Sequence, residues 1–170
     1  MQTRRLGKDG PDVSVICLGA WPIGGGMGVI PDDQAIATIH ASIDAGANFI
    51  DTAEGYQTSE GVLGKALRGR RDEVFLATKL TGDHSLEHMM QAIENSLSSL
   101  GTDYIDLYQL HGPHLSTPIE DTMANLEKLR DDGKIRYIGV SNFSSEQHRE
   151  AAQYGVINAS QPRYNMLYRK

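Results

Sequence analysis

Short apolar runs alternate with longer amphipathic stretches along this chain. The apolar runs are bounded by glycine and polar residues, which is typical of buried β-strands. They predict strands at residues 14–19, 48–51, 74–79, 104–111, 135–140 and 156–161. The stretches between them repeat apolar residues every three or four positions and predict helices at residues 32–46, 59–67, 86–100, 118–133 and 144–155. Residues 1–6 and 12–15 flank a turn and predict a hairpin before the first core strand.

Two of the predicted helices begin with a capping signal. Thr117 and Glu120 form a capping-box pattern, with Pro118 at the first helical position. Ser144 and Gln147 form a second pattern of the same kind. Both patterns predict that a hydroxyl oxygen accepts a hydrogen bond from the first turn of its helix.

The order of these elements predicts the fold class. Strand and helix alternate five times before a sixth strand, and no linker or low-complexity stretch interrupts them. Each helix then provides the crossover between two parallel strands, so residues 1–170 are expected to form a single α/β domain. This pattern fits either an open doubly wound sheet or a (β/α)8 barrel.

Polar residues stand at the carboxyl ends of five consecutive predicted strands. Because parallel strands end at one face, their side chains are expected to meet at one rim, where active sites of α/β proteins lie. These residues are Asp51 with Tyr56 shortly after it, Lys79, His111, Ser141 with Asn142, and Gln161.

The chemistry of this rim is that of proton transfer. An ammonium group near a phenol lowers the phenol pKa, so Lys79 is expected to make Tyr56 a better proton donor. Asp51 is expected to pair with Lys79, and His111 to bond a substrate oxygen. The side-chain amides of Asn142 and Gln161 and the hydroxyl of Ser141 suit the amide edge of a flat heterocycle such as nicotinamide.

Several stretches together resemble the aldo-keto reductases. They are DTAEGYQTSEGVLGKAL, VFLATKL, LGTDYIDLYQLH, GKIRYIGVSNF and SQPRYNML, and the resemblance covers nearly the whole chain. It implies a (β/α)8 TIM barrel with an N-terminal hairpin at its base. It also implies reversible hydride transfer between NADPH and an aldehyde or ketone, with NADH as the alternative cofactor.

The resemblance implies a role for each rim residue. The family's catalytic tetrad falls on Asp51, Tyr56, Lys79 and His111, with Tyr56 as the general acid in reduction. The cofactor contacts fall on Asp51, Ser141, Asn142 and Gln161, and more weakly on Trp21. The alternative function is a nicotinamide-nucleotide-binding sensor or accessory subunit with little turnover.

The chain departs from the family pattern in length. It stops just past the sixth strand, so strands seven and eight and the loops that hold the cofactor would be missing. We therefore expect either that it is part of a longer reductase or that it self-associates. Gln57 and residues 112–114 are smaller departures, which are expected to tune substrate specificity.

Composition limits the binding partners and the cellular location that we expect. The net charge of −6 and pI of about 5.4 argue against binding to nucleic acid or an anionic membrane. The N-terminus has no apolar signal segment and no apolar run is long enough to span a bilayer, so a cytoplasmic protein is expected. The single cysteine, Cys17, lies in an apolar run and is expected to be buried.

Other motifs favour less specific interpretations. Residues 24–28 are rich in glycine but lack the G-x-G-x-x-G spacing, which favours an active-site loop over a phosphate nest. His84, His88 and His114 have no cysteine or carboxylate set beside them, so no metal site is predicted, and the first two are expected at the surface. Lys79 as a Schiff-base lysine and Glu54 as a second acid are further alternatives, although Glu54 is expected to bond nearby backbone.

Overall fold

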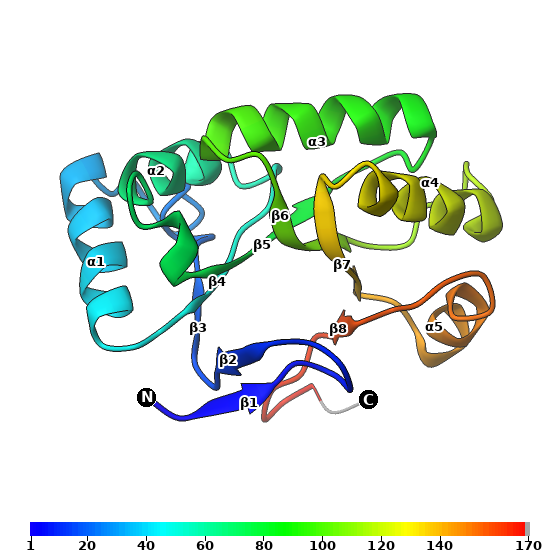
Figure 1. Cartoon of the computed structure of the whole chain (residues 1–170), viewed down its shortest axis with the longest axis horizontal. Coiled ribbons are helices and arrows are strands. Elements are labelled where there is room, and N and C mark those ends of the chain that lie inside the picture. Colours follow the sequence, from blue (N-terminus) through cyan, green and yellow to red (C-terminus); the bar gives the residue numbers. More distant parts are fainter. Residues whose placement is uncertain (169–170) are drawn as a thin grey trace.

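The computed structural model describes residues 1–168 and shows a small hairpin beside a larger parallel sheet (Figure 1). The antiparallel hairpin consists of β1 (Thr3–Arg5) and β2 (Asp12–Ser14). The parallel sheet has six strands in sequential order, namely β3 (Cys17–Gly19), β4 (Phe49–Asp51), β5 (Phe75–Leu80), β6 (Ile105–Leu110), β7 (Ile135–Ser141) and β8 (Ala159–Gln161). Sequential order with parallel pairing is the arrangement of a (β/α)8 barrel, and not that of a doubly wound sheet.

Helices cover the outer side of the curved sheet (Figure 1). They are α1 (Asp32–Asp44), α2 (Ser59–Ala66), α3 (Leu86–Leu100), α4 (Ile119–Asp131) and α5 (Ser145–Ala151), with a short 3-10 helix at Arg71–Glu73. None of the helices in the described part of the chain combines the length and apolar character that a membrane span needs.

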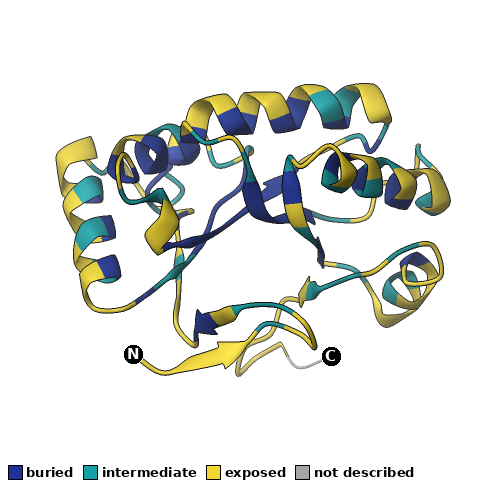
Figure 2. Ribbon diagram, viewed as in Figure 1, coloured by how far each residue is buried: buried dark blue, intermediate teal, exposed yellow. Residues whose placement is uncertain are grey.

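Alternation along the strands builds two hydrophobic clusters. Leu76 and Leu80 of β5 face the helices and belong to the larger cluster. Phe75 and Ala77 face the concave side and pack with Leu107 of β6 and Val13 of the hairpin. The hairpin therefore covers the amino-terminal ends of the strands, and the opposite ends remain for a site. Figure 2 shows that burial is concentrated in the central strands and on the helix faces that meet them.

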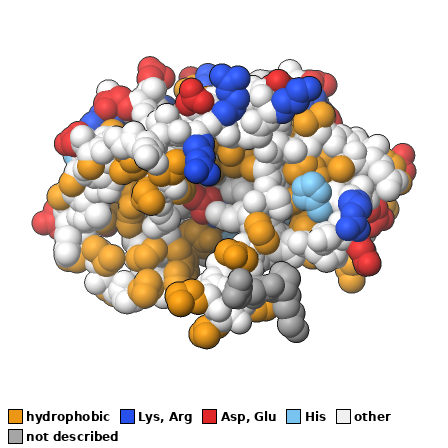
Figure 3. Space-filling model, turned by 90° about the horizontal axis from the view of Figure 1, so that it is seen from below, with side chains coloured by type: hydrophobic (Ala, Val, Ile, Leu, Met, Phe, Trp, Pro, Cys, Tyr) orange, Lys and Arg blue, Asp and Glu red, His pale blue; other side chains and the backbone are white. Residues whose placement is uncertain are grey.

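The sheet is not closed within residues 1–168. Strands β3 and β8 each pair with one neighbour and form the two edges. Seen from below, hydrophobic side chains border the hollow at the centre of the molecule (Figure 3). The concave side is therefore partly open to solvent.

The open edges explain three differences from the sequence-based prediction. The predicted first and last core strands are shorter, because β3 includes only Cys17–Gly19 and β8 only Ala159–Gln161. Val15 and Ile16 are exposed. Cys17 is also exposed, so its predicted burial is wrong. An edge strand has one backbone partner and an uncovered side. The hydrophobic pattern of the sequence does not show which strands lie at an edge.

The two predicted helix caps have different outcomes. Ser144 caps α5 with a complete capping box, in which its Oγ accepts from the Gln147 backbone and the Gln147 side chain accepts from the Ser144 backbone. The cap at Thr117 is wrong, because Pro118 is the N-cap residue of α4 and makes no side-chain bond. The Thr117 hydroxyl donates instead to Asp83 Oδ1, which lies in the loop after β5.

Candidate active site

A buried ion pair lies at the carboxyl end of the sheet. Asp51 is the last residue of β4, and Lys79 lies near the end of β5. The Lys79 ammonium is 1% exposed and donates to Asp51 Oδ2 at 2.6 Å and to the Thr52 carbonyl at 2.7 Å. Two oxygens therefore hold the buried Lys79 ammonium in position, and removing either partner would leave an unpaired buried group.

The loop after β4 places Tyr56 above this pair. The Lys79 Nζ atom lies 5.1 Å from the centroid of the Tyr56 ring. A Cβ atom at Gly24 would lie 1.9 Å from the Tyr56 carbonyl oxygen, so only glycine permits this close approach. Gln57, where the resemblance suggested a departure, has a φ of 49°, a left-handed conformation that costs about 1 kcal/mol for a non-glycine residue.

His111 follows β6 and faces Tyr56. Its Nε2 atom lies 3.5 Å from the Tyr56 hydroxyl, and the two rings meet edge to face with centroids 5.4 Å apart. Burial and, secondarily, the nearby Lys79 charge lower the pKa of His111, while Asp51 opposes this shift. The imidazole is therefore neutral at physiological pH and has one N–H to donate.

Residues from β7 and β8 extend the rim beside His111. Asn142 has a φ of 60°, and its side-chain amide donates to the His111 carbonyl at 2.8 Å and to Ser141 Oγ at 3.2 Å. The Ser141 hydroxyl donates to the Gln161 carbonyl at 3.1 Å, and the Asn142 backbone donates to the same oxygen. These contacts fix Ser141 and Asn142 in place, and Gln161 contributes to them through its backbone.

Trp21 lies at the other end of the rim and is 50% exposed. A Cβ atom at Gly26 would come within 2.4 Å of the indole ring, so the glycine-rich segment folds directly against Trp21. The glycines at positions 24 and 26 are thus explained by packing on Tyr56 and Trp21.

Sequence reasoning missed two residues that support the site. Gln109 of β6 pairs with Lys79 in the sheet register, and its side-chain amide donates to Asp51 Oδ1 at 3.0 Å. Thr81, just after β5, bonds His111 Nδ1 through its hydroxyl at 3.1 Å. Both positions follow from strand alternation, since Gln109 lies two residues before His111 and Thr81 two residues after Lys79.

Glu54 behaves as predicted. Its carboxylate accepts a hydrogen bond from the Thr81 backbone, which ties the Tyr56 loop to the end of β5. Burial raises the pKa of Glu54. The neighbouring Glu60 of α2 is buried and accepts from the Thr78 hydroxyl at 2.7 Å, which fixes α2 to β5 as well.

His84 contradicts its predicted surface location. It is 1% exposed, its Nδ1 atom has no hydrogen-bond partner within residues 1–168, and its ring lies 5.6 Å from that of His114. Burial lowers its pKa to about 4. The loops after β5 and β6 enclose His84, and such contacts between distant segments are invisible in a local pattern. Among the described residues, no three His, Cys, Asp or Glu side chains are grouped to hold a metal ion.

The lowered pKa predicts a loss of stability in acid. The folded pKa is about 4, below the ordinary value of about 6.5. The unfolded chain therefore binds more protons between these two values, and the His84 contribution to stability falls as pH decreases from about 6.5 to about 4. Urea unfolding at a series of pH values measures this slope, and His84→Asn should make it shallower. An unchanged slope in that variant would rule out His84 as its source.

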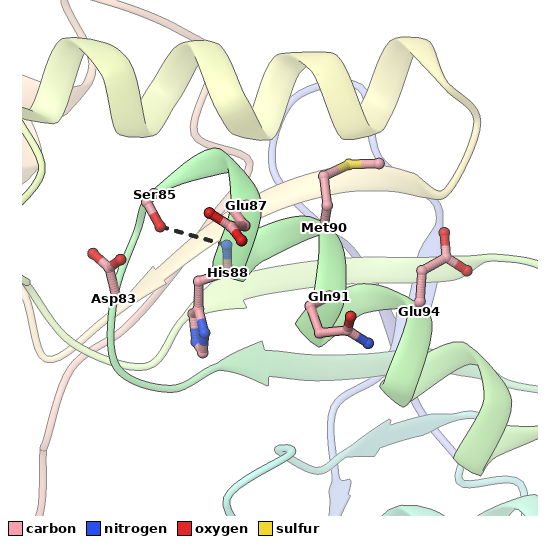
Figure 4. A pocket seen from close by; sticks show the side chains of 7 residues that line it. All are labelled: Asp83, Ser85, Glu87, His88, Met90, Gln91 and Glu94. Carbon is pink, nitrogen blue, oxygen red and sulfur yellow. Dashed lines mark hydrogen bonds between the residues drawn. The ribbon is translucent and has the colours of Figure 1, made fainter.

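A broad hollow lies outside the rim, along the first turns of α3 (Figure 4). It has a volume of about 650 Å³ and is lined by Asp83, Ser85, Glu87, His88, Met90, Gln91 and Glu94. None of the predicted site residues lines it. It is therefore separate from the cluster at the strand ends.

Comparison with known proteins identifies the family. The sequence profile of the aldo/keto reductase family matches residues 15–170. The chain belongs to this family. Aldo-keto reductase YhdN of Bacillus subtilis is 41% identical over 184 residues, which cover 100% of this chain and 56% of the relative. The chain thus spans a little over half the length of the curated relative that it matches.

Solved structures agree with this assignment. The thermostable aldo-keto reductase Tm1743, in complex with the inhibitor epalrestat, matches with a TM-score of 0.89 at 33% identity, covering 97% of this chain and 63% of that one. An aldo/keto reductase of Klebsiella pneumoniae in complex with NADP and acetate matches with a TM-score of 0.79 at 40% identity, covering 86% of this chain and 52% of that one. The fold is thereby confirmed as part of a (β/α)8 barrel, with its N-terminal hairpin and six consecutive strands.

Proposed function

We propose that this chain provides the catalytic part of a reductase that converts an aldehyde or ketone to an alcohol with NADPH. The main support is the convergence of four side chains from three neighbouring strand ends. Lys79 is buried against Asp51 and lies beneath the Tyr56 ring, and burial together with the Lys79 charge lowers the pKa of His111. This arrangement places a phenol and a neutral imidazole side by side at one rim.

The residues divide the work of proton transfer. When bound, the nicotinamide supplies the hydride that reaches the carbonyl carbon. Tyr56 donates its hydroxyl proton to the carbonyl oxygen, and the fixed Lys79 charge stabilises the resulting phenolate. His111 is the second donor and, from its place beside Tyr56, orients the carbonyl oxygen. Asp51 holds Lys79 in place, and Gln109 in turn donates to Asp51.

The rim beside His111 fits the amide end of a nicotinamide. The amide N–H groups of Asn142 contact His111 and Ser141, which leaves its carbonyl oxygen to accept from a ligand. The Ser141 and Gln161 side chains would provide further hydrogen bonds, and Trp21 an aromatic border. NADP in the Klebsiella relative supports NADPH as the cofactor, with NADH as the alternative.

The unpaired edges β3 and β8 affect how this activity is obtained. A barrel of this type closes only when every strand has two neighbours. We propose that further strands, from additional chain or from a second copy, complete the barrel in the active protein. We also propose a cytoplasmic location, since the composition and the single cysteine fit a reducing compartment.

One pair of measurements tests the proposed function. NADPH fluorescence titration measures binding, and aldehyde-dependent NADPH oxidation measures turnover in the same purified sample, whose intact mass is determined first. Binding with steady turnover supports the reductase. Tight binding without turnover of simple aldehydes would favour the sensor or accessory subunit instead. No binding by a protein larger than this chain would contradict both.

The role of Asn142 predicts weaker cofactor binding on its removal. Asn142→Gly deletes the amide without straining a residue whose φ is 60°, whereas Asn142→Ala also strains the backbone. We expect both variants to bind NADPH about five- to tenfold more weakly, the effect of one lost hydrogen bond. Fluorescence titration gives the affinities. Weakening in the alanine variant alone would mean that backbone strain, and not the amide, is responsible.

A further inference from the structure

Thr81 makes three hydrogen bonds at the rim, through three different groups. Its backbone N–H donates to Glu54, and its carbonyl accepts from His88 Nε2 at 3.1 Å. Its hydroxyl lies 3.1 Å from His111 Nδ1. The first two contacts hold the backbone from both sides, once from the Tyr56 loop and once from α3. They fix the backbone from which the exposed Thr81 hydroxyl reaches the His111 ring.

Figure 4 shows the origin of the contact from α3. The His88 side chain extends from the first turn of α3 toward the chain that leaves β5, while the Ser85 hydroxyl accepts from the His88 backbone. A carbonyl oxygen only accepts, so His88 carries its proton on Nε2. The Thr81 backbone therefore has a firm anchor on its carbonyl side.

The contact at Nδ1 bears on where the His111 proton resides, because a threonine hydroxyl either donates to Nδ1 or accepts from it. A neutral imidazole has one donor nitrogen and one acceptor nitrogen, and the partner of one nitrogen selects the role of the other. Nε2 lies 3.5 Å from the Tyr56 hydroxyl. If Nε2 were the acceptor, it would compete with the substrate for the Tyr56 proton. If Nε2 is the donor, both it and Tyr56 can donate to one carbonyl oxygen.

We propose that Thr81 is a positioning residue whose hydroxyl donates to His111 Nδ1 and thereby keeps the ring proton on Nε2. This inference rests on the proposed function, because the carbonyl oxygen is what requires two donors. In this role Thr81 acts through His111 and not directly on the substrate. The lowered His111 pKa supports the proposal, since a neutral ring is the form in which a tautomer must be chosen.

Histidine nitrogen spectroscopy tests the assignment directly. The full protein is labelled with 15N-histidine, and the His111 signals are identified by their absence in His111→Gln. At neutral pH we expect an unprotonated Nδ1 and a protonated Nε2. Thr81→Val, which removes the hydroxyl but keeps the shape, should shift the ring toward a mixture of tautomers. Thr81→Ser should restore the native signals. Thr117→Val removes a rim hydroxyl that bonds Asp83 and serves as the matched control.

Kinetics supply the second measurement. We expect Thr81→Val to lower kcat about tenfold, near the lower end of the effect of removing an outer partner from a functional histidine. The KM for NADPH should stay within a few-fold, and Thr81→Ser should recover kcat. A protonated Nδ1 in the unmodified protein would overturn the proposal, as would unchanged kcat in Thr81→Val. If the valine variant does not fold, the spectra of the unmodified protein and Thr81→Ser still decide the tautomer.

The same experiments separate this inference from the proposed function. The tautomer is observed without substrate, so it is assigned whether or not the protein reduces carbonyls. Full activity in a Tyr56 variant would refute the reductase mechanism and leave the tautomer assignment in place. A protonated Nδ1 together with a strong loss of activity on Tyr56 replacement would refute the role of Thr81 alone.

Discussion

Tyr56→Phe is expected to lower the rate of carbonyl reduction by about 10²–10⁴-fold, the usual contribution of a positioned general acid. The phenylalanine ring keeps its ring contacts with Lys79 and His111 but lacks the hydroxyl that lies beside His111 Nε2 and carries the proton. Affinity for NADPH should stay within a few-fold, because the cofactor is proposed to contact Ser141, Asn142 and Gln161 instead. Steady-state reduction of an aldehyde and fluorescence titration of NADPH measure the two effects separately.

A second tyrosine gives a matched control for this change. Tyr154 follows α5 and is 43% exposed, so Tyr154→Phe removes the same hydroxyl from a surface position. It should leave kcat and NADPH affinity unchanged. Near-normal activity in Tyr56→Phe would show that another group donates the proton. His111 is the next candidate, because its Nε2 atom lies 3.5 Å from the Tyr56 hydroxyl. A parallel loss of binding and activity would instead indicate that the Tyr56 loop has moved.

The arrangement of the rim was predictable because a few strong rules fix it. Repeated strand–helix units demand parallel strands, and parallel strands place their carboxyl ends on one face. Once Asp51, Lys79 and His111 are assigned to strand ends, their convergence follows without any knowledge of loops. The order of the strands did not follow from alternation, which fits a doubly wound sheet as well; only the family resemblance implied the sequential order that the structure has.

The supporting contacts were not predictable to the same degree. Gln109 lies within the predicted strand 104–111, but its bond to Asp51 depends on register across two strands. His84 and Thr117 depend on loops that approach from different parts of the chain, and both were assigned wrongly. Cys17 depends on which strands have two neighbours, and no local pattern reports that. Local periodicity thus predicts elements and faces, while contacts between loops and at sheet edges require the three-dimensional arrangement.

Lys79→Met is expected to lower the free energy of unfolding by about 3–5 kcal/mol, because it leaves the buried Asp51 carboxylate without its cation. The Lys79 side chain is 1% exposed and the Asp51 side chain 11% exposed, so water compensates little for the lost partner. The Thr52 carbonyl also loses a donor. Urea unfolding followed by circular dichroism measures the change, and the double variant Asp51→Asn with Lys79→Met should recover part of it.

The chain contains a pair with nearly the same geometry at the surface. Lys65 Nζ and Asp32 Oδ2 are 2.7 Å apart, compared with 2.6 Å in the buried pair, but their side chains are 55% and 52% exposed. Solvent screens such a pair, so Lys65→Met should cost no more than about 1 kcal/mol. Similar losses in both variants would mean that the buried pair contributes no more to stability than an exposed one, contrary to the expectation. A large difference would show that the Lys79–Asp51 pair beneath Tyr56, on which the proposed mechanism depends, also stabilises the fold.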